Sequence, residues 1–204
     1  MTGVYLHVGS VVLIQKHFKT KGFVQGNIVV NAKGHDVDLS ALPPFLRTLL
    51  VTDGTVTKSI EAYYWEPVLV ESQLQQLVDK PARQTCLKKS PGSQYLHRKV
   101  TLSGQQSRRT YASADSYIHL NVLPETTAQR LVENKIGIGE LLRDEGVESY
   151  REILDLGVET ADETFWDTAK EVAYRTYVIH IEDKPAIEIT EWFPVDLYRD
   201  AESS

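Results

Sequence analysis

The chain has 204 residues, a hydrophobic content of 42% and a formal net charge of −6 at pH 7, which is ordinary for a soluble globular protein. No apolar run approaches the roughly 20 residues that a membrane-spanning helix requires. An acidic balance disfavours general nucleic-acid binding, which uses basic surfaces. We therefore expect neither a nucleic acid nor a membrane as a partner.

Cysteine content and the N-terminal residues bear on the compartment. The single cysteine, Cys86, leaves no internal disulfide and suits a reducing environment. The N-terminus lacks the basic, apolar and small-residue pattern of a secretory signal. We expect a cytoplasmic protein with one domain over residues 1–204. The oligomeric state does not follow from the sequence.

The first third of the chain mixes strand and helix signals. Residues 1–38 are predicted to form extra N-terminal strands, because apolar residues alternate with others and glycines supply turns. A helix is predicted within Ala41–Val51, where prolines stand at its start. The β-branched stretch Val56–Glu71 predicts extended structure. A short helical turn is expected around Leu74–Val78.

The remaining elements alternate between runs of strands and a group of helices. Strands are predicted at Tyr95–Ser103, Tyr111–Leu120, Glu171–Ile181 and Ala186–Pro194. Helices are predicted from Pro124 to about Asn134, at Glu140–Asp144 and at Glu148–Leu156, the last ended by Gly157. This grouping is typical of an α+β protein with a mainly antiparallel sheet and helices packed over one face.

Two predicted strands place a charge on an apolar face. Alternation puts Glu191 on the face shared by Ile187 and Ile189. The same rule puts Arg98 on the face shared by Leu96, Val100 and Leu102. Buried charges are costly unless they are paired or functional. Arg98 and Glu191 therefore form either a buried salt bridge or part of a ligand site, and the pattern leaves both open.

Three further features could belong to such a site. Ala112, Ala114 and Ser116 are small and leave space beside the sheet. Arg175 is either a second anion clamp or an outward-facing side chain. The turn Ile136–Gly139 either offers backbone N–H groups to an anion or is a plain loop.

Other chemistries find no support in the sequence. The six histidines show no metal-ligand spacing. Cys86 has no evident histidine partner that would make it a nucleophile. Phosphate loops, dinucleotide fingerprints and serine-hydrolase elbows are absent. We expect no metal and no cofactor.

With these residues assembled, the chain resembles the chorismate pyruvate-lyase family, in particular its archaeal, mycobacterial and cyanobacterial branch. The likeness covers about residues 40–198, whereas residues 1–38 match no family that we can name. The matching stretches are Leu49–Thr57, Glu61–Tyr63, Glu66-Pro67, Arg98–Gly104, Ser107, Tyr111-Ala112, Ala114, Ser116, Ile138–Arg143, Glu148, Tyr150–Glu152, Leu154, Arg175–Tyr177 and Ile189–Pro194.

The resemblance implies a chorismate lyase-like fold, with a ligand buried between an antiparallel sheet and helices. It implies Arg98 as the carboxylate clamp and Glu191 at the opposite end of the ring, near its oxygen substituent. The backbone of Ile138 would help to hold the carboxylate, and Val56 would line the pocket. The implied partner is a small-molecule substrate, and the implied activity is elimination of pyruvate from chorismate without a metal or organic cofactor.

One position departs from the pattern of this branch, and it motivates the alternatives. An arginine typically precedes the Leu-Pro found here at Leu123-Pro124, and this chain has Val122. Either Arg175 substitutes for it, or the substrate carries fewer anionic groups, as in a repurposed enzyme of secondary metabolism that catalyses cyclisation, elimination or rearrangement. A ligand-binding module ranks third, since we find no DNA-binding segment beside the family-like core.

Overall fold

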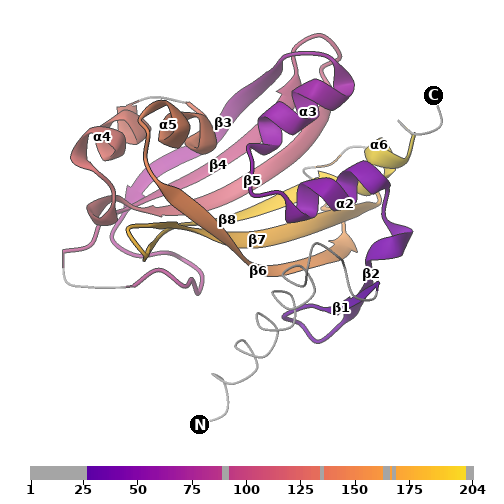
Figure 1. The fold of residues 1–204 in the computed structure, drawn as a ribbon, viewed down its shortest axis with the longest axis horizontal. Coiled ribbons are helices and arrows are strands. Elements are labelled where there is room, and N and C mark those ends of the chain that lie inside the picture. The colour runs from indigo at the N-terminus through magenta and orange to yellow at the C-terminus, as the bar shows by residue number, and fades with distance from the viewer. Residues whose placement is uncertain (1–26, 89–91, 134–135, 163–165, 167–168, 201–204) are drawn as a thin grey trace. The chain divides into compact units, whose positions relative to one another are not determined.

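The computed structural model describes residues 27–88, 92–133, 136–162, 166 and 169–200. The elements are β1 (Ile28–Val30), β2 (Asp36–Asp38), η1 (Leu39–Ala41), α2 (Pro44–Val51), α3 (Val56–Tyr64), β3 (Val68–Val78), β4 (Tyr95–Gly104), β5 (Thr110–His119), η2 (Leu120–Val122), α4 (Glu125–Glu133), α5 (Ile138–Asp144), β6 (Ser149–Thr160), β7 (Glu171–Ile181), β8 (Lys184–Pro194) and α6 (Val195–Asp200). β1 and β2 form a hairpin, and the other six strands form an antiparallel sheet in the order β3-β4-β5-β8-β7-β6 (Figure 1). The predicted α+β class with a mainly antiparallel sheet is confirmed.

The chain divides into two compact units. One consists of Met1–Thr52, Ile153–Thr176 and Trp192–Ser204, and the other of Asp53–Glu152 and Tyr177–Glu191. Strands β6, β7 and β8 contribute residues to both units. We call the second the 53–152 unit, and it contains Arg98 and Glu191.

Helices α4 and α5 of the 53–152 unit cover one face of its strands. They lie side by side in Figure 1. Their apolar side chains join a buried cluster with residues from β4, β5, β7 and β8. The buried members are Leu96, Ile118, Leu123, Leu131, Leu141, Leu142, Tyr177, Ile179, Ile181, Ala186, Ile187 and Ile189. The face that alternation predicted for Ile187 and Ile189 is therefore the one that α4 and α5 cover.

The connection from α3 to β3 is held against the β4–β5 turn. Trp65 closes α3 with a left-handed backbone (φ 56°) and is 88% exposed. The next residue, Glu66, accepts hydrogen bonds from the backbone N–H groups of Gln106 and Ser107 at 2.9 and 3.0 Å, and from the hydroxyl of Tyr111. Glu66 therefore cross-links two segments that are about forty residues apart in the chain.

The other unit has its own small aromatic clusters. Phe45 of α2 and Tyr198 of α6 have ring centroids 6.0 Å apart. Trp166 is buried with Ala161 and Val172, and Trp192 packs against them. The indole N–H of Trp192 donates to Glu159 at 2.9 Å.

Two predictions for residues 56–78 are wrong. Val56–Tyr64 is a helix rather than extended chain, because Val56 and Ile60, four residues apart, are both buried on one helical face. Leu74–Val78 is the end of strand β3 rather than a helical turn, and it pairs with β4 from Tyr95 to Lys99. At Leu74–Val78, long-range pairing with β4 outweighs local propensity.

The predicted helix at Glu148–Leu156 is also wrong, since Ser149–Thr160 is strand β6. Gly157 lies inside this strand and caps no helix. A Cβ atom at Gly157 would lie 2.7 Å from the ring of Tyr174, so glycine is needed there for close packing. The ring of Tyr150 stacks on His180 of β7, with centroids 4.5 Å apart.

The structure describes only part of the segment in which N-terminal strands were predicted. β1 and β2 pair antiparallel from Ile28↔Asp38 to Val30↔Asp36. The strands predicted within residues 1–26 lie outside the described residues. A single domain over residues 1–204 stays a prediction. Within the described ranges, we find no helix with the length and apolar character needed to cross a membrane.

Candidate functional site

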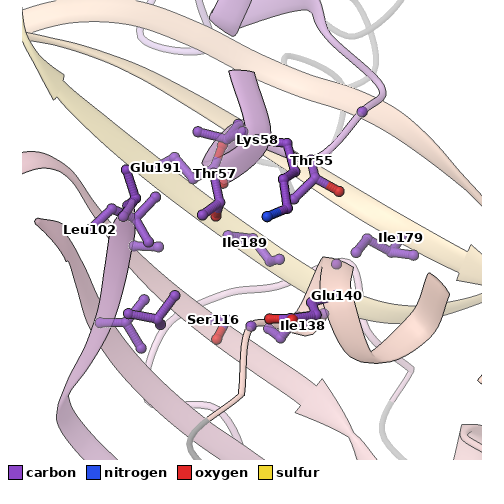
Figure 2. Close-up of a pocket in the computed structure, with 18 of the residues that line it drawn as sticks. Thr55, Thr57, Lys58, Leu102, Ser116, Ile138, Glu140, Ile179, Ile189 and Glu191 are labelled. Atoms are coloured by element: carbon purple, nitrogen blue, oxygen red, sulfur yellow. The ribbon is translucent and has the colours of Figure 1, made fainter. Parts of the chain in front are cut away.

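One cavity of about 240 Å³ lies within the 53–152 unit. Figure 2 shows Thr55 and Lys58 from the start of α3, Ser116 and Glu191 from the sheet, and Glu140 from α5 around it. The lining residues are Gly54, Thr55, Val56, Thr57, Lys58, Glu61, Val68, Val70, Arg98, Val100, Leu102, Ala114, Ser116, Gly137, Ile138, Gly139, Glu140, Arg143, Arg151, Tyr177, Ile179, Ile189 and Glu191.

Arg98 is the most deeply buried cation of this lining. It stands on β4 and is 2% exposed. Its Nη1 donates to the backbone carbonyl of Ile136 at 2.5 Å, while Nε and Nη2 are buried without a hydrogen-bond partner among the described residues. Burial lowers the pKa of the guanidinium through desolvation, although an arginine still stays charged. Nε and Nη2 form one edge of the guanidinium, which is the edge that binds a carboxylate through two parallel hydrogen bonds.

Glu191 contributes a buried carboxylate from β8. It is 7% exposed and accepts a hydrogen bond from the Tyr177 hydroxyl of β7 at 3.2 Å. Leu102 and Ile189 line the same cavity. The cavity therefore combines a cation on β4 with a carboxylate on β8, and the structure brings together the two residues that the strand pattern singled out.

Three more of the predicted site residues line this cavity. Ser116 faces Arg98 across the β4–β5 ladder, and its hydroxyl donates to the backbone carbonyl of Arg98 at 3.2 Å. Val56 begins α3 and Ile138 begins α5. Both residues belong to the lining.

Val122 and Arg175 are not among the lining residues. Val122 ends η2 and packs, partly buried, against the apolar cluster beneath α4 and α5. Arg175 belongs to the other unit, where its Nη1 donates to the backbone carbonyl of Thr52 at 2.8 Å. The position at which the resemblance expects an arginine therefore contributes to the core of this chain.

Several charged lining residues were missed by the sequence reasoning. Lys58 pairs with Glu61 at 2.7 Å, and this hydrogen bond is the main cause that lowers the pKa of Glu61. Arg143 pairs with Asp144 at 3.2 Å. Arg151 falls within the helix that was predicted at Glu148–Leu156. Because of this wrong assignment, the sequence did not predict which face of the sheet its side chain occupies. Strand alternation along β6 was the signal that could have found it.

Metal-ligand clusters were sought across the part of the chain that the structure describes. It contains no group of three or more histidine, cysteine or acidic side chains arranged to hold an ion. The polar side chains that line the cavity are those of arginine, lysine, glutamate, serine, threonine and tyrosine.

Solved structures share this fold at low sequence identity. PhnF from Mycobacterium smegmatis aligns with a TM-score of 0.56 and 10% identity, covering 72% of this chain and 66% of that chain. The effector domain of PhnF aligns with a TM-score of 0.54 and 11% identity, covering 70% of this chain and 90% of that chain. These matches confirm the predicted chorismate lyase-like architecture.

Relatives in sequence point to one family. A chorismate pyruvate-lyase of Mycobacterium leprae (strain TN) is 31% identical over 160 residues, which cover 76% of each chain. A chorismate pyruvate-lyase of Mycobacterium tuberculosis (strain ATCC 25618 / H37Rv) is 25% identical over 174 residues, which cover 81% of this chain and 87% of that protein. Residues 50–200 match the family model described as "Chorismate pyruvate-lyase Rv2949c-like". The chain therefore belongs to the Rv2949c-like chorismate pyruvate-lyase family.

Proposed function

We propose that this protein is a lyase that eliminates pyruvate from chorismate and releases a hydroxybenzoate. The observation that carries the proposal is the free Nε–Nη2 edge of Arg98 in a cavity that Glu191 also lines. A buried guanidinium with unused donors destabilises the folded state unless a ligand accepts their hydrogen bonds. A carboxylate is the ligand that fits this edge.

The substrate supplies the driving force for this reaction. Chorismate carries an enolpyruvyl ether on a cyclohexadiene ring. The ether C–O bond breaks, the ring loses a proton, and the enolpyruvate gains one to become pyruvate. The ring becomes aromatic, so the protein has to orient the dianion, exclude water and stabilise charge at the breaking bond. Neither a metal nor an organic cofactor is required by this chemistry.

The lining residues divide this work. Arg98 binds the ring carboxylate, and Ile138 and Val56 enclose that end of the ring. Ser116 holds the β4 backbone beneath Arg98. Glu191 meets the opposite end, where it acts as acid or base near the oxygen substituent. Tyr177 orients Glu191 through its hydroxyl.

The cellular setting follows from composition. A single cysteine supports a reducing compartment, and we place the protein in the cytoplasm.

Pyruvate release from chorismate tests the function directly. Purified protein is incubated with chorismate, and pyruvate is measured by reduction with lactate dehydrogenase, while the aromatic product is separated by chromatography. We expect release well above the uncatalysed rate. The Glu191→Gln variant keeps an acceptor oxygen for Tyr177 but loses the carboxylate, so kcat should fall by about 10²–10⁴-fold. Equal rates with and without protein would refute the lyase function.

The same assay addresses the two alternatives. A substrate with fewer anionic groups was suggested by Val122, but that side chain packs in the apolar cluster. Turnover of chorismate by the natural sequence would exclude the need for an arginine at this position. Tight binding of chorismate without any product would instead favour a ligand-binding module.

A further inference from the structure

Chorismate has two carboxylates, and Arg98 accounts for only one of them. The second carboxylate belongs to the enolpyruvyl group that leaves as pyruvate. A dianion in a protein with a net charge of −6 needs a second local cation. Val122 cannot supply it, and the candidates are the other cations of the cavity lining.

Among the three other lining cations, two are already paired with acids. Lys58 is bound to Glu61 at 2.7 Å, and Arg143 to Asp144 at 3.2 Å, and both side chains are more than half exposed. Arg151 is half-buried and makes no ion pair with a carboxylate of the described residues. Of the four lining cations, Arg98 and Arg151 are thus the two whose charge no described carboxylate neutralises.

Arg151 is held in the same way as Arg98. Its Nη1 donates to the backbone carbonyl of Asp53, as Nη1 of Arg98 donates to that of Ile136. Its Nε is buried, and neither Nε nor Nη2 reaches an acceptor among the described residues. Both arginines are therefore anchored through one nitrogen and leave the Nε–Nη2 edge for a ligand.

The guanidinium of Arg151 lies at the starts of two helices. Its Nη2 lies 3.6 Å from the point that a Cβ atom on Gly139 would occupy, and Thr55 Oγ1 lies 3.5 Å from the same point. Thr55 precedes α3 and Gly139 is the second residue of α5. The guanidinium therefore lies near both helix starts, at the lining of the cavity.

Arg98 and Arg151 come from strands that are not adjacent in the sheet. β4 and β6 are separated by β5, β8 and β7, which places their backbones roughly 19 Å apart at ordinary strand spacing. Both side chains line the same cavity of about 240 Å³, which has room for a small organic dianion. Glu191 comes from β8, which lies between these strands.

We propose that Arg151 binds the enolpyruvyl carboxylate of chorismate while Arg98 binds the ring carboxylate. This inference rests on the proposed lyase function and names the residue that recognises the leaving group. Because the hydroxybenzoate product has one carboxylate, Arg151 contributes to the affinity for the substrate but not to the affinity for this product. The contact is lost when pyruvate departs, so the product is retained by one arginine only.

The test compares a dianion with a monoanion. Dissociation constants for chorismate and for 4-hydroxybenzoate are measured by calorimetric titration in the slow Glu191→Gln background, with and without Arg151→Met. KM and kcat for pyruvate release are measured for wild-type protein and for the Arg151→Met single variant. We expect Arg151→Met to weaken chorismate binding by about 10- to 100-fold. The affinity for 4-hydroxybenzoate should stay within about threefold, and Arg151→Lys should restore part of the loss.

Arg47→Met is the matched control. Arg47 is also half-buried and also donates from Nη1 to a backbone carbonyl, that of Ser40 at 3.3 Å, but it does not line the cavity. Its loss should change neither affinity. Arg98→Met should weaken both ligands, since both carry the ring carboxylate.

The outcomes separate this inference from the lyase function. If Arg151→Met weakens both acids equally, Arg151 only holds the helix starts or the ring carboxylate, and the inference fails. An unchanged affinity for chorismate refutes it as well. If wild-type protein binds chorismate without releasing pyruvate, the lyase function fails, while the ratio of the two dissociation constants still decides the role of Arg151.

Discussion

Arg98 shows how a residue can serve function at a cost in stability. Its Nε and Nη2 donors are buried without partners among the described residues. Unmade hydrogen bonds of a buried charged group destabilise the folded state by about 1–3 kcal/mol or more. Methionine is also unbranched, although shorter, and needs no hydrogen bonds.

We predict that Arg98→Met abolishes activity without loss of stability. The free energy of unfolding should stay level or rise by about 1–2 kcal/mol. Affinity for 4-hydroxybenzoate should fall by at least about 100-fold. Urea unfolding and calorimetric titration measure the two effects. A variant that is much less stable than wild type would mean that the Nη1 bond to Ile136 outweighs the unmade donors.

At the scale of elements, Glu66 couples the α3–β3 connection to the β4–β5 turn. Hydrogen bonds from the Ser107 side chain, from Tyr111 and from the backbone of Ser107 and Gln106 lower the pKa of Glu66 from 4.5 to about 2. The pKa is lower in the folded state than in the unfolded chain. The ionised Glu66 side chain therefore stabilises the folded state fully above about pH 4.5, and this stabilisation is lost as the pH falls toward 2.

We predict that Glu66→Gln makes the free energy of unfolding less dependent on pH in the acid range. Wild-type protein should lose stability between about pH 4.5 and pH 2 more steeply than the variant. Urea unfolding at a series of pH values measures this difference. Parallel profiles would show that Glu66 titrates in the same way in folded and unfolded protein.

Strand β6 depends on a glycine for its packing against β7. We predict that Gly157→Ala lowers the free energy of unfolding by about 1–3 kcal/mol, because its Cβ would meet the ring of Tyr174 at 2.7 Å. Gly137→Ala is the control, since its Cβ would find no atom closer than 3.8 Å. Similar losses in both variants would point to backbone entropy rather than to the ring.

The elements could be predicted from sequence where the local pattern and the long-range pairing agree. The patterns of β4, β5 and β8 placed Leu96, Ile118 and Ile187 on the face that packs in the buried cluster under α4 and α5. α3 and β6 were assigned wrongly because their burial is imposed by partners far along the chain. Arg151 was missed for the same reason, since its side is defined only once β6 pairs with β7.

For the molecule as a whole, ligand binding should raise the stability of the 53–152 unit. We predict that 4-hydroxybenzoate at 100 times its dissociation constant raises the free energy of unfolding of this unit by about 2.7 kcal/mol. For a chain of this length that corresponds to a rise in Tm of about 5–10 °C. Differential scanning calorimetry measures the shift, and Arg98→Met at the same ligand concentration should show a much smaller one. A shift of equal size in the variant would place the ligand elsewhere.

The cavity itself could be predicted only in outline. Alternation identified Arg98 and Glu191 as buried charges, and the resemblance to a family gave them roles. The sequence did not reveal that Val122 belongs to the core, because an apolar residue beside Leu123-Pro124 suits a pocket wall and a core equally well. Its place depends on how α4 and α5 pack on the sheet.

The distribution of tryptophans gives each unit an optical signal of its own. Trp65 belongs to the 53–152 unit and is 88% exposed, whereas Trp166 and Trp192 share an apolar cluster of the other unit. Exposed indoles emit at longer wavelengths and are reached by iodide, and buried indoles are shielded from it. Quenching with iodide therefore isolates the emission of the cluster in the native protein. During denaturation, a red shift of that emission reports the opening of the cluster without any introduced label.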